Sequence, residues 1–252
     1  TPEQVHELER LTERMRRICR TCVENNVPLL VDAEHTHFQP AIDYIAMKMT
    51  LEFSGSSEDP NSLPVIYNTY QNYLKDAKAR MIHDHDFVFE QHKKKFAAKI
   101  VRGAYIRLEC ARAETFSLPR PVNDTIEETH RSYNTSVEYA LQNNSNMGVF
   151  IATHNQDTLQ LATNLIVNKY HLNTKQNNIV FAQLYGMGDS LTLALVQKGF
   201  NVAKYVPYGP VEEVMPYLSR RVVENGDALS GTTIETRRIA QELQRRIPFF
   251  RG

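Results

Sequence analysis

The sequence predicts an α/β fold with a parallel sheet, either a doubly wound sheet or a (β/α) barrel. Three observations support this prediction. Short apolar runs without polar alternation are typical of strands that are buried on both faces. Segments with apolar residues at helical spacing separate these runs. Polar residues and glycines follow the runs, where α/β folds place their ligands.

Six runs are predicted to be strands, and each is a short apolar stretch. They cover residues 28–32, 65–70, 97–102, 148–152, 179–184 and 201–206. Strands that alternate with helices pair in parallel, because the helix carries the chain back to the starting edge of the sheet.

Helical patterns precede, separate and follow these strands. They cover residues 1–26, 41–53, 72–95, 124–142, 157–169, 190–198 and 210–225. Thr1 and Pro2 are typical of a helix start, and Pro210 begins the last helix in the same way. The residues 54–62 form a polar loop between the second helix and the second strand.

Composition bounds the class of protein. The 252 residues contain 29 Lys and Arg and 29 Asp and Glu, so the formal net charge is zero and nucleic acid is not an expected partner. No apolar run is long enough for a membrane span, and the N-terminal residues do not resemble a signal peptide. The three cysteines, Cys19, Cys22 and Cys110, predict no disulfide framework, and Cys19 and Cys22 are expected to be ordinary helix residues.

The six predicted strand ends are polar and should converge on one face of the sheet. They comprise Asp32, Ala33 and Glu34; Tyr70 and Gln71; Arg102, Gly103, Ala104 and Tyr105; Thr153, His154 and Asn155; Gln183, Leu184, Tyr185 and Gly186; and Tyr205, Pro207, Tyr208 and Gly209. This layout predicts a ligand site. The glycine-rich phosphate motifs and the G-x-S-x-G nucleophile motif are absent, which disfavours Rossmann, P-loop and covalent hydrolytic chemistry.

The segment after the last strand allows two interpretations. Tyr217, Arg220 or Arg221, and Glu224 recur at helical spacing and share one face. In the first, Arg220 and Glu224 form an exposed ion pair of little energetic consequence. In the second, the adjacent Arg220 and Arg221 bind a carboxylate at the mouth of a barrel. Spacing alone does not decide between them.

The strand ends and the last helix contain the motifs VDAE at 31–34, TYQ at 69–71, KIVRGAY at 99–105, ATHN at 152–155, and YVPYGP and YLSRRVVEN within 205–225. In sequence and in order, these motifs resemble the proline dehydrogenase family of the eukaryotic, mitochondrial type. The resemblance implies a FAD-dependent (β/α)8 barrel, an oxidoreductase of proline catabolism that converts L-proline to Δ1-pyrroline-5-carboxylate. It further implies that electrons pass to quinone, with the protein on the matrix side of the inner mitochondrial membrane in peripheral contact with it.

The resemblance also implies a role for particular residues. Arg220 and Arg221 would bind the proline carboxylate, and Asp32 would support the pocket through a neighbouring side chain. The residues implied to surround the substrate are Tyr105, Leu184, Tyr205 and Tyr217, and those implied to contact FAD are Gln71, Lys99, Val101, Arg102, Gly103, Ala104, Thr153, His154 and Glu224. Asp32, Tyr105, Tyr205, Arg220 and Arg221 form the implied catalytic set.

One difference from the family pattern concerns strand number. A (β/α)8 barrel has eight strands, whereas the sequence indicates six, matching the family from its third strand onward. We therefore expect residues 1–252 to form a single FAD-binding barrel domain in which the N-terminal part of the barrel is missing.

Three alternatives remain open. A hydroxyproline dehydrogenase of the same family is disfavoured by the bulky Tyr205, which would crowd a ring hydroxyl. A metal-dependent barrel hydrolase is suggested by His35 and His37 and by the His83 to Asp86 cluster, although no metal site is expected because that cluster falls within a helix. A catalytically inactive fragment that acts as an interaction module is the third.

Overall fold

The structure, a computed structural model, describes residues 1–226, 236 and 240–246, with side chains for 1–219, 236 and 240–246. Its centre is a parallel sheet of six strands in the order β1-β2-β3-β4-β5-β6. The strands are β1 (Leu29–Val31), β2 (Ile66–Gln71), β3 (Phe96–Val101), β4 (Met147–Ala152), β5 (Ile179–Leu184) and β6 (Val202–Tyr205). All six predicted strands are confirmed.

Sequential strand order decides between the two predicted architectures. Each strand pairs with the strand before and after it in the chain, as in the register of Thr69 with Lys99 and of Lys99 with Phe150. A doubly wound sheet reverses its strand order at a switch point, and no reversal occurs here. The sheet instead curls into a half-barrel.

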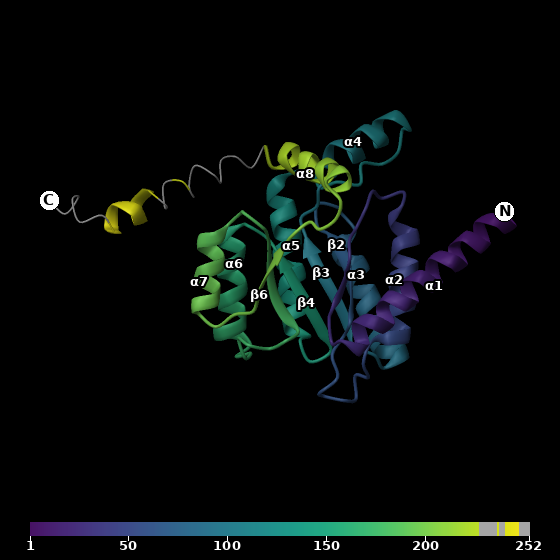
Figure 1. The fold of residues 1–252 in the computed structure, drawn as a ribbon, viewed down its shortest axis with the longest axis horizontal. Coiled ribbons are helices and arrows are strands. Elements are labelled where there is room, and N and C mark those ends of the chain that lie inside the picture. The colour runs from purple at the N-terminus through teal and green to yellow at the C-terminus, as the bar shows by residue number, and fades with distance from the viewer. Residues whose placement is uncertain (227–235, 237–239, 247–252) are drawn as a thin grey trace.

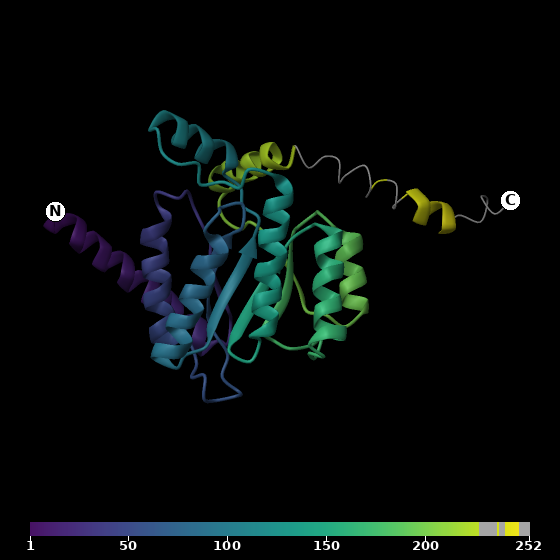
Figure 2. The ribbon, with the colours of Figure 1, turned by 180° about the vertical axis from the view of Figure 1, so that it is seen from behind.

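The convex face of the sheet carries a layer of helices (Figures 1 and 2). These are α2 (Gln39–Phe53), α3 (Ala77–Asp86), α5 (Ile126–Gln142), α6 (Gln156–Asn164) and α7 (Asp189–Gln197), with π-helical turns at Phe87–Gln91 and Leu165–Lys169. The main hydrophobic core lies between this layer and the sheet. It includes the fully buried Tyr70, Ile100, Tyr133, Ile151 and Phe181.

Alternation along the strands separates this core from the concave face. In β3, Ala98 and Ile100 point to the helices, while Lys99 and Val101 point to the concave side. The concave side of the sheet is lined by polar and small residues at the strand ends, which leaves space for a ligand.

The remaining helices lie outside this layer. In α1 (Pro2–Glu24) the expected start is confirmed, because Thr1 forms a capping box with Gln4 and Pro2 follows. The helix projects from the body, with only Thr12 and Cys19 buried (Figure 1). The last helix, α8 (Val211–Gly226), lies across the carboxyl ends of the strands.

Two expectations about helices were wrong. The helix predicted for 72–95 begins only at Ala77, because residues 72–76 form the turn that leaves β2. The helix α4 (Ile106–Thr115) was not predicted at all. Its apolar side chains Ile106 and Leu108 are exposed and show no clear apolar face, so periodicity gives little signal.

Candidate active site

A cavity of about 560 Å³ opens at the carboxyl ends of the strands, on the concave side of the sheet. All six strands or the loops after them contribute to its wall, together with α8. Among the predicted site residues, the cavity is lined by Asp32, Gln71, Lys99, Val101, Gly103, Ala104, Tyr105, Thr153, His154, Leu184, Tyr205 and Tyr217. The parallel sheet and α8 therefore bring together residues as distant in sequence as Asp32 and Tyr217.

Lys99 provides a cation on the wall of this cavity. It lies on the concave face of β3, and its Nζ forms an ion pair with the carboxylate of Asp32 at the end of β1. The same Nζ lies 5.7 Å from the centre of the Tyr205 ring, within cation–π range. The Lys99 side chain is 13% exposed and that of Asp32 is 55% exposed, so the cation is the more enclosed partner.

Two aromatic rings form the part of the wall nearest α8. The centres of the Tyr205 and Tyr217 rings are 5.8 Å apart, in a tilted arrangement. Tyr205 ends β6 and Tyr217 comes from α8, so this contact fixes how the helix sits over the strand ends. Leu184, the last residue of β5, adds an apolar side chain to the same cavity.

Gly103 lets the backbone after β3 pass close to a buried ring. Its φ is +118°, and a Cβ atom at this position would lie 1.6 Å from Cδ1 of Tyr73. Only glycine combines this φ with the absence of a side chain. Burial raises the pKa of the Tyr73 phenol, and the neighbouring Glu109 carboxylate adds to the effect. The ring is thus a fixed neutral support under residues 103 and 104.

His154 is held in place at the end of β4. Its Nε2 accepts a hydrogen bond of 3.2 Å from the backbone N–H of Leu184, so this nitrogen carries no proton. A Cβ atom at Gly188 would come within 3.1 Å of the imidazole Nδ1. The imidazole is therefore enclosed between β5 and the turn that follows it.

Arg102 is the predicted site residue that the structure does not bring into the cavity. Its guanidinium donates to His130 Nδ1 at 2.9 Å, Thr153 Oγ1 at 2.8 Å and Thr158 Oγ1 at 2.9 Å. It also lies 4.4 Å from the centre of the Tyr133 ring. Burial lowers the pKa of the guanidinium. The side chain joins β3 to the helix layer, and it touches the cavity only through Thr153.

Three further predicted residues lie on α8. The backbone places Arg220, Arg221 and Glu224 in this helix, on the same side of the sheet as the cavity, whereas their side chains are outside the described part of the structure. The two interpretations of the arginine pair therefore remain open.

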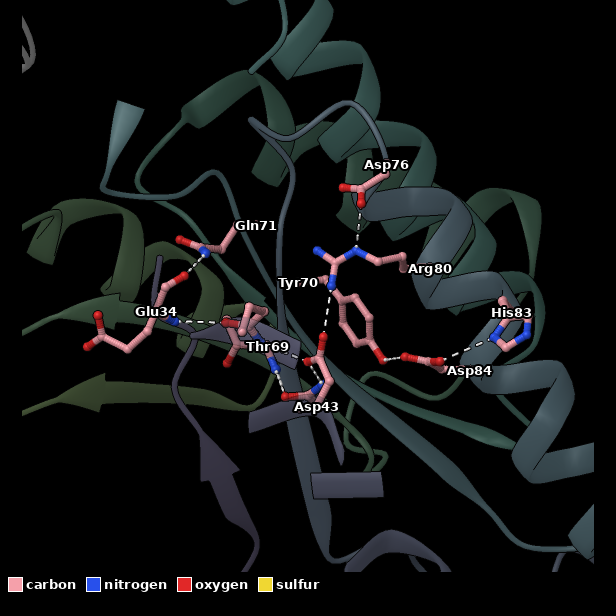
Figure 3. A network of polar contacts seen from close by, with 11 residues as sticks. Glu34, Asp43, Thr69, Tyr70, Gln71, Asp76, Arg80, His83 and Asp84 are labelled. Atoms are coloured by element: carbon pink, nitrogen blue, oxygen red, sulfur yellow. Dashed lines mark hydrogen bonds and ion pairs between the residues drawn. The ribbon is translucent and has the colours of Figure 1, made fainter. Parts of the chain in front are cut away.

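The loop after β1 is held by polar contacts that sequence reasoning missed. The backbone N–H of Glu34 donates to Gln39 Oε1 at 2.9 Å, and the Glu34 carbonyl accepts from Gln71 Nε2 at 2.8 Å. Gln39 in turn donates to Asp43 Oδ1 at 2.7 Å. The peptide of Glu34, which lines the cavity, is thus fixed on both sides (Figure 3).

Asp43 connects this loop to the helix layer. Its carboxylate accepts from Asn68 Nδ2 at 2.7 Å and from Arg80 Nη1 at 2.9 Å, and Arg80 also pairs with Asp76 at 3.1 Å (Figure 3). The sequence carried no clear signal for these contacts, because Gln39 precedes the helix predicted for 41–53; its exposure of only 3% is seen in the structure alone.

The histidines that suggested a metal hydrolase do not converge on one point. His35 and His37 stack on each other after β1, with ring centres 5.4 Å apart, while His83 lies on α3 in the outer layer (Figure 3). In the residues that the structure describes, no group of three or more His, Cys, Asp or Glu side chains is arranged to hold a metal ion.

Known proteins resemble the chain in sequence and in fold. The family profile described as "Proline dehydrogenase" matches residues 2–233. "Proline dehydrogenase 2, mitochondrial" of Arabidopsis thaliana is 40% identical over 98% of this chain and 51% of its own length. "Proline dehydrogenase 1, mitochondrial" of Homo sapiens is 38% identical over 98% of this chain and 40% of its own length.

A solved structure gives the same result for the fold. Proline utilization A (PutA) from Bdellovibrio bacteriovorus, inactivated by N-propargylglycine, superposes with a TM-score of 0.76 and 25% identity, over 87% of this chain and 22% of that chain. The chain spans about half the length, or less, of the relatives named here. The profile match, the identities and the shared fold agree, and they establish that this chain belongs to the proline dehydrogenase family.

Proposed function

We propose that this chain forms the flavin- and proline-binding surface of a FAD-dependent proline dehydrogenase. The enzyme would be an oxidoreductase that converts L-proline to Δ1-pyrroline-5-carboxylate. One observation carries the proposal: the cavity gathers twelve of the site residues that the motif resemblance implies, from every strand of the sheet or the residues directly after it, and from α8. We further propose that the whole chain belongs to one catalytic barrel domain.

The residues of the cavity fit a flavin. Lys99 places a positive charge on the wall, and positive charge favours a cofactor that becomes negative on reduction. Gly103 lets the backbone at the edge of the cavity pass directly against the Tyr73 ring, which leaves no room for a Cβ atom. Gln71, Thr153 and His154 add polar edges to the same surface. When bound, FAD would supply the two-electron acceptor for the substrate ring.

The substrate side of the proposal lies nearer to α8. Tyr205 and Tyr217 form an aromatic wall of two tilted rings against which a five-membered ring can pack. Arg220 and Arg221, on the same helix, would bind the carboxylate, because guanidinium binds carboxylate through two parallel hydrogen bonds. Asp32 would act indirectly, by holding the Lys99 ammonium in place.

The choice between proline and hydroxyproline depends on Tyr205 in this proposal. "Hydroxyproline dehydrogenase" of Bos taurus is also a relative, 35% identical over 97% of this chain, so the two substrates must be separated by local geometry. The Tyr205 ring lines the cavity and is packed by Tyr217 and Lys99. We propose proline as the substrate, because a fixed phenol leaves less room for a ring hydroxyl.

Electron transfer to quinone and a mitochondrial location complete the proposal. The plant and human relatives are named mitochondrial, and the family resemblance extends this to the matrix side of the inner membrane. In the part of the chain that the structure describes, no helix is long and apolar enough to cross a bilayer.

The test uses the full-length protein loaded with FAD, without oxygen. We expect L-proline to bleach the visible flavin absorbance, and the variant Lys99→Met to bind FAD more weakly. Lys198→Met, which removes an exposed lysine after α7, is the matched control and should leave both properties unchanged. A folded protein that takes up no flavin, or whose flavin does not respond to L-proline, would overturn the proposal.

A further inference from the structure

A buried carboxylate lies behind the cavity, on the helix that the sequence did not predict. Glu109 of α4 is 2% exposed, which is rare for an acidic residue unless its charge is satisfied. Both of its oxygens bind one residue of the loop after β1: Oε1 accepts from the Thr36 backbone N–H at 2.7 Å, and Oε2 accepts from Thr36 Oγ1 at 2.6 Å. We call this pair of bonds the Thr36–Glu109 clamp.

The clamp lies next to a residue of the cavity wall. His35 precedes Thr36, and its ring centre is 4.1 Å from that of Tyr105, at an interplanar angle of 46°. Tyr105 lines the cavity and begins α4, and its carbonyl accepts from the backbone N–H of Glu109 at 2.9 Å. These contacts form a closed circuit. Tyr105 contacts His35, the next residue Thr36 binds Glu109, and Glu109 lies one helical turn after Tyr105 and donates its backbone N–H to the Tyr105 carbonyl.

Tyr105 also contacts a buried apolar cluster. Its side chain packs against Tyr73, Leu74 and Val122, which are fully or almost fully buried. Tyr105 therefore contacts both a rigid cluster and the His35 ring, and the position of His35 depends on a loop. The clamp is what ties that loop to α4.

We infer that Glu109 is a positioning residue that fixes the Tyr105 ring in the cavity wall through Thr36 and His35. The inference rests on the proposed function only in giving Tyr105 a substrate to contact. Hydrogen bonds to a carboxylate are about twice as strong as those between neutral groups, and a buried carboxylate without partners is unfavourable. Both effects hold the loop in one position, so the ring is ordered before a ligand arrives.

The first test reads the position of residue 105 without any enzyme activity. These 252 residues contain no tryptophan. The variant Tyr105→Trp, made in the full-length protein and measured without flavin, therefore introduces one indole at this site. Its fluorescence emission reports the surroundings of residue 105. Adding His35→Ala sets the size of the change in emission that follows when the neighbouring imidazole ring is lost. The emission of any tryptophan elsewhere in the full-length protein is removed by subtracting the spectrum of the protein with the native Tyr105.

Four variants of the clamp are then compared in this background. Thr36→Val keeps the shape of the side chain but loses the hydroxyl, and Glu109→Ala loses the carboxylate; both should move the emission to that of His35→Ala. Thr36→Ser and Glu109→Gln keep hydrogen-bonding groups at both ends and should retain most of the parent emission. Glu114→Ala, an exposed acidic residue of the same helix, is the control and should change nothing.

The second test measures binding in the FAD-loaded protein with the native Tyr105. Cyclopentanecarboxylate has the ring and carboxylate of proline but no nitrogen to oxidise, so its binding can be followed from the flavin spectrum. Thr36→Val should raise its dissociation constant and the KM for proline about 10-fold, the loss expected for one hydrogen bond to a charged group. The value of kcat should fall much less, and Thr36→Ser should restore binding.

The outcomes separate this inference from the proposed function. If the emission of Thr36→Val, with an unchanged thermal transition, equals that of the parent, the clamp does not position Tyr105 and the inference is wrong. If the emission changes while ligand binding does not, the positioning role stands and the place of Tyr105 in the substrate pocket is wrong. Thr36→Val and Glu109→Gln carry the test if Glu109→Ala does not fold, because both keep the size of the side chain that they replace.

Discussion

Arg102 is the residue for which the motif resemblance and the structure give different expectations. The motif resemblance implies a FAD contact for this residue, whereas the structure turns its guanidinium toward the helix layer. We predict that Arg102→Met lowers the stability of the protein and affects flavin binding only through that loss. The perturbation removes three hydrogen bonds, of 2.8 to 2.9 Å, and the contact with the Tyr133 ring.

The size of the loss follows from the partners that remain. Thr153 Oγ1 still accepts from the Asn155 N–H, and Thr158 Oγ1 still donates to Asn134, so neither hydroxyl is left unpaired. A charge-assisted hydrogen bond contributes about 1.5–3 kcal/mol to stability. We use the low end of this range for each of the three bonds, and lower the sum because bonds that share one guanidinium are not additive. The expected loss in unfolding free energy is about 3 kcal/mol. For a domain of this size that corresponds to a decrease of roughly 6–12 °C in Tm.

The assay is thermal unfolding of the protein with and without FAD, followed by circular dichroism. Arg131→Met removes an exposed arginine of α5 and is the matched control, expected to change stability by less than about 0.5 kcal/mol. A variant Arg102→Met that unfolds at the parental temperature without FAD but no longer binds FAD would refute the reasoning. The guanidinium would then act on the cofactor, as the motif implies.

Four further predictions address other parts of the site and the core. Gly103→Ala should prevent formation of the flavin site, measured as flavin content of the folded protein, because the new methyl group would overlap the Tyr73 ring; full flavin content would contradict this. Tyr205→Ser should raise kcat/KM for hydroxyproline relative to proline by up to about 100-fold, and an unchanged ratio would remove Tyr205 from the substrate pocket. Arg221→Met should reduce kcat/KM for proline at least ~10-fold and that for pyrrolidine, which lacks the carboxylate, much less; equal losses would rule out carboxylate binding. Burial lowers the pKa of His85 below its ordinary 6.5, so the folded protein binds a proton at this residue less readily than the unfolded chain. The stability that neutral His85 contributes is therefore present above pH 6.5 and is lost as the pH falls through the lowered pKa. The difference in unfolding free energy between the parent and His85→Gln should therefore shrink on acidification, and a constant difference would show that His85 does not titrate with unfolding.

The strands were predictable because each is a short apolar run with a polar residue at its carboxyl end. Lys99 and Gln71 occupy such positions, and parallel pairing brings them to one cavity regardless of their distance in sequence. The order of the strands was not predictable from periodicity alone, since barrels and doubly wound sheets share the same pattern. The motif resemblance made that choice, and the pairing of consecutive strands confirms it.

Other features depend on contacts that no local pattern contains. The direction of the Arg102 side chain depends on His130 and Thr158, which lie on two later helices. Glu109 is an ordinary helix residue in sequence, and its burial arises only when Thr36 is brought against it. Such residues are set by tertiary packing, which competes with local preference wherever polar groups become buried.

The consecutive order of the strands has a consequence for how the protein opens. Every strand pairs only with its neighbours in the chain, so the sheet resembles a linear array in which each unit is stabilised by the two beside it. The central strands β3 and β4 have six residues each and a partner on both sides, whereas β1 has three residues, β6 has four, and each has one partner among the described strands. In a protein made of these 252 residues alone, backbone amides of β3 and β4 should therefore exchange with solvent only in global unfolding, while β1 and β6 open in smaller, more frequent fluctuations. In that 252-residue protein, Asp32 follows one outer strand and Tyr205 ends the other, so both lie on the parts of the sheet that open most readily. Lys99 lies on β3, the part that opens least.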